Sequence, residues 1–206
     1  MAKKITLLAL ALLLAIVATA QGRFDVAAWG GLSMGQIDGD DAGSYNHPGL
    51  AAGFESTFAL GEEQGLLRAL VGFGFIQKGS FIQQVDRRIN LSYIEIPIML
   101  TLNFGDGRLR LGAGVAPAVL VDAKVYDSDV YNQLQSNNFR RFDAVPLCLG
   151  VRYMVTPNLG LEARYQNSML PITVESGSGT YRLFRTNQGI FNRNVVFSLV
   201  YRWLPR

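Results

Sequence analysis

Charged side chains recur at alternating positions along several stretches whose intervening residues are largely apolar. Nine charges of both signs lie at such positions: Glu55, Arg68, Lys78, Glu95, Arg110, Arg152, Glu162, Arg164 and Arg202. Charges on one shared face either pair with each other as a ladder of salt bridges or line a polar path for ions or protons. Burial favours pairing, because a buried charge is costly unless an opposite charge and hydrogen bonds accompany it.

Nucleophilic or metal chemistry has little support in the sequence. His47 is the single histidine, and a lone histidine in a polar loop is more often solvated than catalytic, even with Asp41 and Ser44 close by. There is no His/Cys cluster of the zinc type. The run Asp38-Gly39-Asp40-Asp41 lacks the acid at the twelfth position of a calcium loop, since position 49 is Gly. We expect no catalytic residues, no cofactor and no metal.

The elements that position the charges follow a two-residue period, which indicates strands with two different faces. In residues 91–104, alternate positions are Ile94, Ile96, Ile98, Leu100, Leu102 and Phe104. The same split recurs near residues 24–33, 52–58, 67–75, 109–122, 144–155, 159–166 and 194–203. Most of these eight stretches have about 10 residues, the length that a tilted strand needs to cross a bilayer. Pro97 and Pro117 lie inside two of them and predict local distortions.

The links between these strands alternate between short and long. Short links rich in turn formers lie at 61–65, 105–107 and 156–158, and long polar links lie near 34–49, 79–88, 126–141 and 169–192. Outer-membrane barrels have short periplasmic turns and longer external loops. The sequence therefore predicts an all-β, eight-stranded antiparallel up-and-down transmembrane barrel with both termini in the periplasm. A soluble barrel of the lipocalin type is the alternative, with the apolar face inside.

Within such a barrel the charged face lines the lumen. Eight strands leave a bore that side chains fill, so the salt-bridge ladder is favoured over an ion path. We expect Glu95 to lie beside Arg110 and Arg68, and Glu162 beside Arg152. The predicted structural network comprises Glu55, Arg68, Glu95, Arg110, Arg152, Glu162, Arg164 and Arg202.

The first twenty residues differ from the rest of the chain. Lys3 and Lys4 precede a short apolar run, and Ala18-Thr19-Ala20 has the small-residue pattern of a cleavage site. This predicts a signal peptide over 1–20, cleaved between Ala20 and Gln21, and an outer-membrane barrel domain over 21–206. Without Lys3 and Lys4 the chain has 17 basic and 16 acidic residues, a net charge of +1. It has no basic tract, so we expect no nucleic-acid partner.

Two segments resemble the PorT-like outer-membrane β-barrel family of the Bacteroidota. They are GFGFIQKGS at 72–80 and YIEIPIML at 93–100, and LGAGVAP at 111–117 resembles the family's glycine-rich fifth strand. Thr101 stands where the family often has Lys. The resemblance implies an outer-membrane barrel but no single function. The family's founding member is associated with a gliding and secretion machinery, and nothing in this sequence ties the chain to that role.

The function expected from these patterns is structural or interactive. The barrel would be a monomer with a plugged polar lumen, surrounded by outer-membrane lipid, and its long external loops would meet an envelope or extracellular protein partner. The alternatives are a narrow pore or a transport or secretion accessory and, least favoured, a lipid-modifying enzyme of the outer membrane.

Overall fold

The computed structural model describes residues 24–39, 45–60, 66–82, 86–126, 139–143, 146–173 and 190–203. The predicted signal peptide, its cleavage site at Ala20 and Gln21, and parts of the four long links lie outside these residues. No helix in the described part of the chain is long and apolar enough to cross a membrane.

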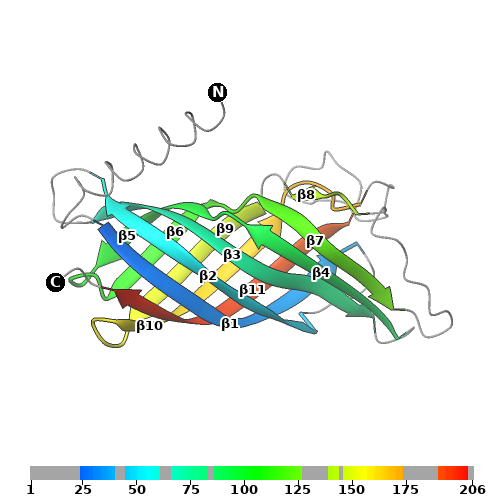
Figure 1. Ribbon diagram of the computed structural model, residues 1–206, viewed down its shortest axis with the longest axis horizontal. Helices are drawn as coiled ribbons and strands as arrows, with labels where there is room; N and C mark the ends of the chain where they lie inside the picture. Colours follow the sequence, from blue (N-terminus) through cyan, green and yellow to red (C-terminus); the bar gives the residue numbers. More distant parts are fainter. Residues whose placement is uncertain are drawn as a thin grey trace, which may run out of the picture.

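The described chain forms one closed antiparallel sheet (Figure 1). Its segments are β1 (Phe24–Asp38), β2 (His47–Ala59), β3 (Leu67–Ile82), β4 (Arg87–Glu95), β5 (Ile98–Phe104), β6 (Leu109–Val115), β7 (Ala118–Tyr126), β8 (Phe142–Asp143), β9 (Pro146–Met154), β10 (Leu159–Ser168) and β11 (Phe191–Trp203). Three walls consist of successive segments, β4 with β5, β6 with β7, and β8 with β9. The eleven segments are thus eight walls, and the pairings of β1 with β2 and β11, and of β2 with β3, close the ring. The predicted fold class is confirmed.

The two prolines interrupt their walls where the sequence predicts distortion. Pro97 separates β4 from β5, and Pro117 separates β6 from β7. The interruptions face each other, since the Ile96 amide donates to the Pro117 carbonyl at 2.9 Å. The pairing register is the same on both sides of the gap. The missing proline amides therefore break the ladder locally without shifting it.

Several strands are longer than the sequence pattern indicates. β1 continues to Asp38, β3 continues to Ile82, and β2 begins at His47, so parts of the predicted links 34–49 and 79–88 are strand. The short link at 105–107 is a tight turn as expected. Gly105, Asp106 and Gly107 there have φ of 57°, 56° and 82°, a conformation that glycine adopts without strain.

Along most of each wall the apolar face points outward and the charged face inward. Leu100, Leu161 and Phe197 are 57%, 54% and 56% exposed, whereas Glu55, Arg152 and Arg164 are at most 3% exposed. Water would penalise such an outer surface, but lipid would not. This distribution excludes the lipocalin-type alternative, whose apolar face would be inside.

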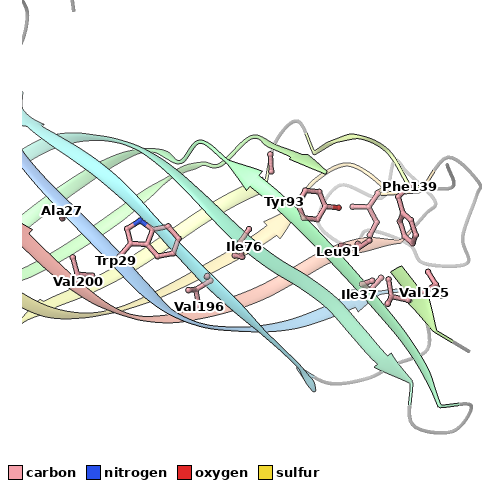
Figure 2. Packing of buried hydrophobic residues seen from close by; sticks show 14 residues of the cluster. Ala27, Trp29, Ile37, Ile76, Leu91, Tyr93, Val125, Phe139, Val196 and Val200 are labelled. Atoms are coloured by element: carbon pink, nitrogen blue, oxygen red, sulfur yellow. The ribbon is translucent and has the colours of Figure 1, made fainter. Parts of the chain in front are cut away.

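The polarity reverses at the end of the barrel that carries β4 and β7. In β4, Ile89, Leu91 and Tyr93 point inward and are buried, whereas Arg88 and Asn90 point outward. Figure 2 shows Ile37, Leu91, Val125 and Phe139 gathered inside this end of the barrel. An apolar interior with a polar exterior is the arrangement that water favours. Along β4 and β7 the reversal therefore marks where the wall leaves the lipid. The lumen at this end holds both kinds of side chain, because Lys78 and Ser80, which stand opposite Leu91 and Ile89, are also buried.

Candidate functional site: the charge network of the lumen

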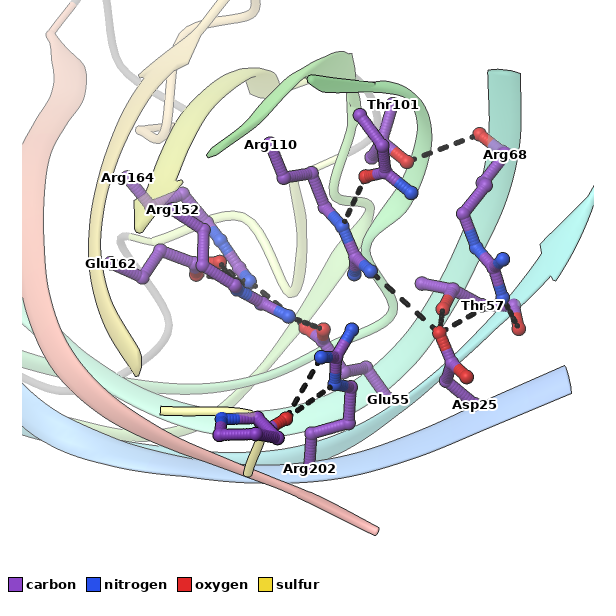
Figure 3. A network of polar contacts seen from close by, with 12 residues as sticks. Asp25, Glu55, Thr57, Arg68, Thr101, Arg110, Arg152, Glu162, Arg164 and Arg202 are labelled. Atoms are coloured by element: carbon purple, nitrogen blue, oxygen red, sulfur yellow. Dashed lines mark hydrogen bonds and ion pairs between the residues drawn. The ribbon is translucent and has the colours of Figure 1, made fainter. Parts of the chain in front are cut away.

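Four buried charges form a closed ring inside the barrel (Figure 3). This lumen ring consists of Glu55 from β2, Arg152 from β9, and Glu162 and Arg164 from β10. Arg152 Nη1 lies 2.5 Å from Glu55 Oε1, and Arg152 Nε donates to Glu162 Oε2 at 2.7 Å. Arg164 Nη2 lies 3.2 Å from Glu55 Oε2 and 2.5 Å from Glu162 Oε1. Each guanidinium therefore contacts both carboxylates, and the ring as a whole is neutral.

The lumen ring joins strands that are not neighbours. β1 and β11 separate β2 from β10 in the sheet, so the bonds from Glu55 to Arg152 and Arg164 run across the lumen. Arg164 also lies over the ring of Trp29 from β1, 5.0 Å from its centroid, a contact that favours a cation. The ring thus ties opposite walls together as well as neighbouring ones.

A second cluster lies nearer the 105–107 turn and centres on Asp25. Arg68 Nη2 is 3.0 Å from Asp25 Oδ2, and Arg110 Nη2 is 3.9 Å from the same oxygen. Arg68 also donates to the Thr57 carbonyl at 3.2 Å, and Arg110 Nε donates to Asn103 Oδ1 at 2.9 Å. One carboxylate therefore holds two arginines from different walls.

The expected pairing of Glu95 with Arg68 and Arg110 is wrong. Both oxygens of Glu95 accept from Gln166 Nε2, at 3.0 and 2.9 Å. The register explains the difference, because Arg68 stands opposite Thr101 on the neighbouring strand, six residues beyond Glu95. At about 3.3 Å per residue, this offset is roughly 20 Å along the wall, too far for an ion pair.

The remaining sequence-predicted charges lie apart from the lumen ring. Arg202 is half-buried, and its Nε and Nη2 donate to the Pro157 carbonyl at 3.2 and 2.8 Å, which fastens the last strand to the β9–β10 turn. Lys78 is buried in the outer half of the lumen, with its Nζ 5.3 Å from the centroid of the Tyr93 ring.

The space beside the lumen ring is small. A cavity of about 10 Å³ adjoins it and is lined by Leu70, Met99, Thr101, Arg110, Gly112, Gly150, Arg152 and Glu162. That volume is about what one water molecule requires. The arrangement can fix strands and hold a water at this level, and it offers no room there for a larger ligand.

Sequence reasoning missed two members of the network. Asp25 lies four residues before Trp29, so the two-residue period places both on the inner face of the first strand, although that strand has the weakest pattern. Gln166 occupies the charged face of its strand, but an amide gives no sign of its partner. The period identifies which side chains point inward, while the partner depends on the register.

The histidine considered for catalysis begins β2. The backbone of Gly79 approaches it closely, since a side chain at that glycine would contact His47 Nε2 at 3.0 Å. Asp40, Asp41 and Ser44 lie outside the described residues. Within the described ranges, no group of three or more His, Cys, Asp or Glu side chains is arranged to hold a metal ion.

Comparison with solved structures gives several similar chains. The attachment invasion locus protein Ail of Yersinia pestis is 10% identical, with a TM-score of 0.48 over 88% of this chain and 99% of that one. The same protein in complex with the heparin analogue sucrose octasulfate is 9% identical, with a TM-score of 0.46 over 88% and 99% of the two chains. Neisserial surface protein A is 15% identical, with a TM-score of 0.43 over 87% and 97%.

Comparison with curated proteins gives no match. The family model described as "Outer membrane protein beta-barrel domain" matches residues 19–173, about three quarters of the sequence. The matched residues include β1 to β10 and every member of the lumen ring. Together with the closed barrel and its apolar outer face, this match shows that the chain belongs to the outer-membrane β-barrel domain family and resides in the outer membrane.

Proposed function

We propose that this protein is a sealed outer-membrane barrel that acts as a structural or interaction protein and neither conducts ions nor catalyses a reaction. The observation that carries the proposal is the lumen ring, whose salt bridges join β2 to β9 and β10 across the bore. The cavity of about 10 Å³ beside it supports a sealed lumen, and so does the apolar cluster in the outer half.

The proposed arrangement in the envelope follows from the links. The long links face the exterior, both termini face the periplasm, and residues 1–20 are the signal peptide that directs export. The barrel works as a monomer that meets an envelope or extracellular protein through its loops. We also propose that the chain is related to the PorT-like family, on the basis of the resemblance in the 72–80 and 93–100 segments.

Conductance tests the sealed lumen. In planar bilayers, we expect the unaltered barrel to give no stable open current. The double variant Arg152→Ser/Glu162→Ser removes two large members of the lumen ring while keeping the net charge, and we expect brief low-conductance openings from it. Stable channels from the unaltered protein would contradict the proposal and favour the narrow pore.

Labelling of single thiols tests the orientation. Cys148 is buried, so the native protein should react little with a membrane-impermeant maleimide in intact cells. Asp86→Cys, next to the β3–β4 link, should be labelled in intact cells, whereas Asp106→Cys, in the short turn at 105–107, should be labelled only after lysis. The reverse pattern would overturn the proposed orientation.

A further inference from the structure

The outer wall carries a polar groove that the lumen network does not involve. The groove has a volume of about 490 Å³ and is lined by Asn46, His47, Pro48, Gln77, Phe81, Arg88, Asn90, Leu91, Ser92, Asp122, Lys124 and Tyr126. These residues come from β2, β3, β4 and β7, which are successive neighbours in the sheet, and from the residue that precedes β2.

The groove opens on the outside of the barrel. Arg88, Asn90 and Ser92 alternate with the buried Ile89, Leu91 and Tyr93 along β4, so their side chains point away from the lumen. On β7, Lys124 and Tyr126 flank the buried Val125 in the same way. The groove is therefore a surface feature of the wall with no connection to the bore through these side chains.

Hydrogen bonds between side chains and the backbone fix one rim of the groove. Asn46 pairs with Phe81 like an added strand residue, since its Nδ2 donates to the Phe81 carbonyl at 2.7 Å and its Oδ1 accepts from the Phe81 amide at 3.3 Å. Gln77 Oε1 accepts from the Leu50 amide at 3.0 Å. These bonds hold the start of β2 against β3, so the rim exists before any ligand binds.

The groove combines three kinds of binding group. Arg88 and Lys124 provide cations, Asn90 and Ser92 provide hydrogen-bond donors and acceptors, and Tyr126 provides an exposed aromatic side chain. Among the described residues, the acidic partners of the two cations are exposed: Asp86 lies 3.7 Å from Arg88 and Asp122 lies 3.2 Å from Lys124. Arg88 also lies over the Phe81 ring, 4.7 Å from its centroid. Exposed pairs contribute little, so an incoming anion can replace them. Hydroxyl-rich ligands that bear phosphate or carboxylate suit this mixture of groups.

The position of the groove identifies the layer that its ligand occupies. Along β4 the next outward-facing residue toward the lipid is Ile94, and along β7 it is Val121, which is 56% exposed. The polarity of the wall reverses between these residues and the groove, and a register shift between Ser92 and Tyr93 lies at the same level. The groove thus begins where the apolar belt ends, at the depth of lipid headgroups.

We propose that this groove binds the phosphorylated sugar headgroup of a glycolipid in the outer leaflet. The acyl chains of that lipid would lie along Ile94 and Val121, directly below the groove. The identity of the leaflet rests on the orientation proposed above. A soluble protein partner is less suited to the site, because the groove lies on the outward face of the wall and adjoins the exposed apolar surface at Ile94 and Val121.

Binding is measured on the full-length mature protein purified in detergent, with purified lipopolysaccharide as the probe and native mass spectrometry to count bound molecules. The test variant is Arg88→Ala/Lys124→Ala, and a second variant, Asn90→Ala, keeps the charge. The matched control is Arg108→Ala/Arg141→Ala, which removes two exposed cations that do not line the groove.

We expect the groove double variant to bind the probe about tenfold more weakly, the effect of about 1.4 kcal/mol in binding free energy. Asn90→Ala should weaken binding by a smaller factor, and the control should match the unaltered protein. Equal loss in the control, or no loss in the groove variants, would overturn the site. Phosphatidylglycerol binding as strong as that of lipopolysaccharide would overturn the proposed recognition of a sugar headgroup, because phosphatidylglycerol offers a phosphate but no sugar.

This outcome is separable from a failure of the proposed orientation. Binding in detergent does not depend on which way the barrel is inserted, whereas labelling of Asp86→Cys in intact cells reports orientation alone. Binding by a barrel whose Asp86→Cys variant is shielded would keep the headgroup site and overturn its assignment to the outer leaflet.

Discussion

Glu55→Leu should strongly destabilise the barrel. Glu55 is 3% exposed and contacts both Arg152 and Arg164, so its loss leaves two buried guanidinium groups with Glu162 alone. Breaking a buried ion pair by removing one partner costs about 3–5 kcal/mol. We expect a free energy of unfolding lower by about this amount, measured by urea titration in lipid vesicles and by the temperature at which the folded band disappears on a gel.

The control for this prediction is Glu95→Gln. Glu95 is fully buried, as Glu55 nearly is, but accepts its hydrogen bonds from the neutral amide of Gln166. Replacing its carboxylate by an amide leaves one hydrogen bond within reach, so we expect a cost of about 1 kcal/mol. Equal stability of Glu55→Leu and the unaltered protein would show that the lumen ring does not support the fold.

Leu100→Arg should give the second large effect, and its size should depend on depth. Leu100 is 57% exposed and lies near the middle of the outward-facing apolar row from Ile94 to Phe104. An arginine at the bilayer midplane costs about 2–4 kcal/mol, and near the interface about 0–1 kcal/mol. We therefore expect Leu100→Arg to lower the free energy of unfolding in vesicles far more than Phe104→Arg does.

Phe104→Arg is a matched control because it lies on the same face of the same strand, four positions away. In both variants an exposed apolar side chain becomes a cation, and only the depth differs. Equal costs for the two variants would mean that lipid does not set the stability of this face, which would contradict the assignment of the apolar row to the membrane.

The sequence is a good guide to the walls of this barrel. The two-residue period in residues 91–104 separates Glu95 and Thr101 from Ile98 and Leu100, and the structure keeps that separation. The period is readable because lipid outside and charge inside impose different side chains on the two faces. Pro97 and Pro117 were equally readable, since a proline amide cannot join the ladder on any strand.

The ion-pair partners of residues on opposite walls of the lumen cannot be predicted from the sequence in the same way. Glu55 reaches Arg164 over a sequence separation of 109 residues, and only the closure of the sheet brings β2 to face β10. The pairing expected for Glu95 is wrong because the sequence pattern indicates which strands are neighbours but does not give their register, which places Arg68 opposite Thr101. The alternation of the first strand is too weak to identify Asp25 as an inward-facing residue, although Asp25 shares a face with Trp29.

Where the apolar outer face of the wall ends, the residue types at inward and outward positions of the sequence exchange places. In residues 87–95, RRINLSYIE, the inward positions are Ile89, Leu91 and Tyr93 until Glu95 restores a charge. Arg87 and Arg88, the first residues of this stretch, fall in the predicted link 79–88 but belong to β4. Lipid favours apolar side chains on the outside of the wall, whereas water favours polar ones there. The two ends of the same strand therefore have opposite patterns of apolar and polar residues.

The span of the lumen ring also has a consequence for rates. The bond between Glu55 and Arg164 joins residues 109 positions apart, and such distant contacts form late because the intervening chain must first be ordered. Interactions absent from the transition state slow unfolding without speeding folding. The lumen ring should therefore form after the barrel has inserted into the membrane, and it should slow unfolding. Loss of Glu55 should shorten the lifetime of the folded barrel in the membrane while leaving the time needed to insert nearly unchanged.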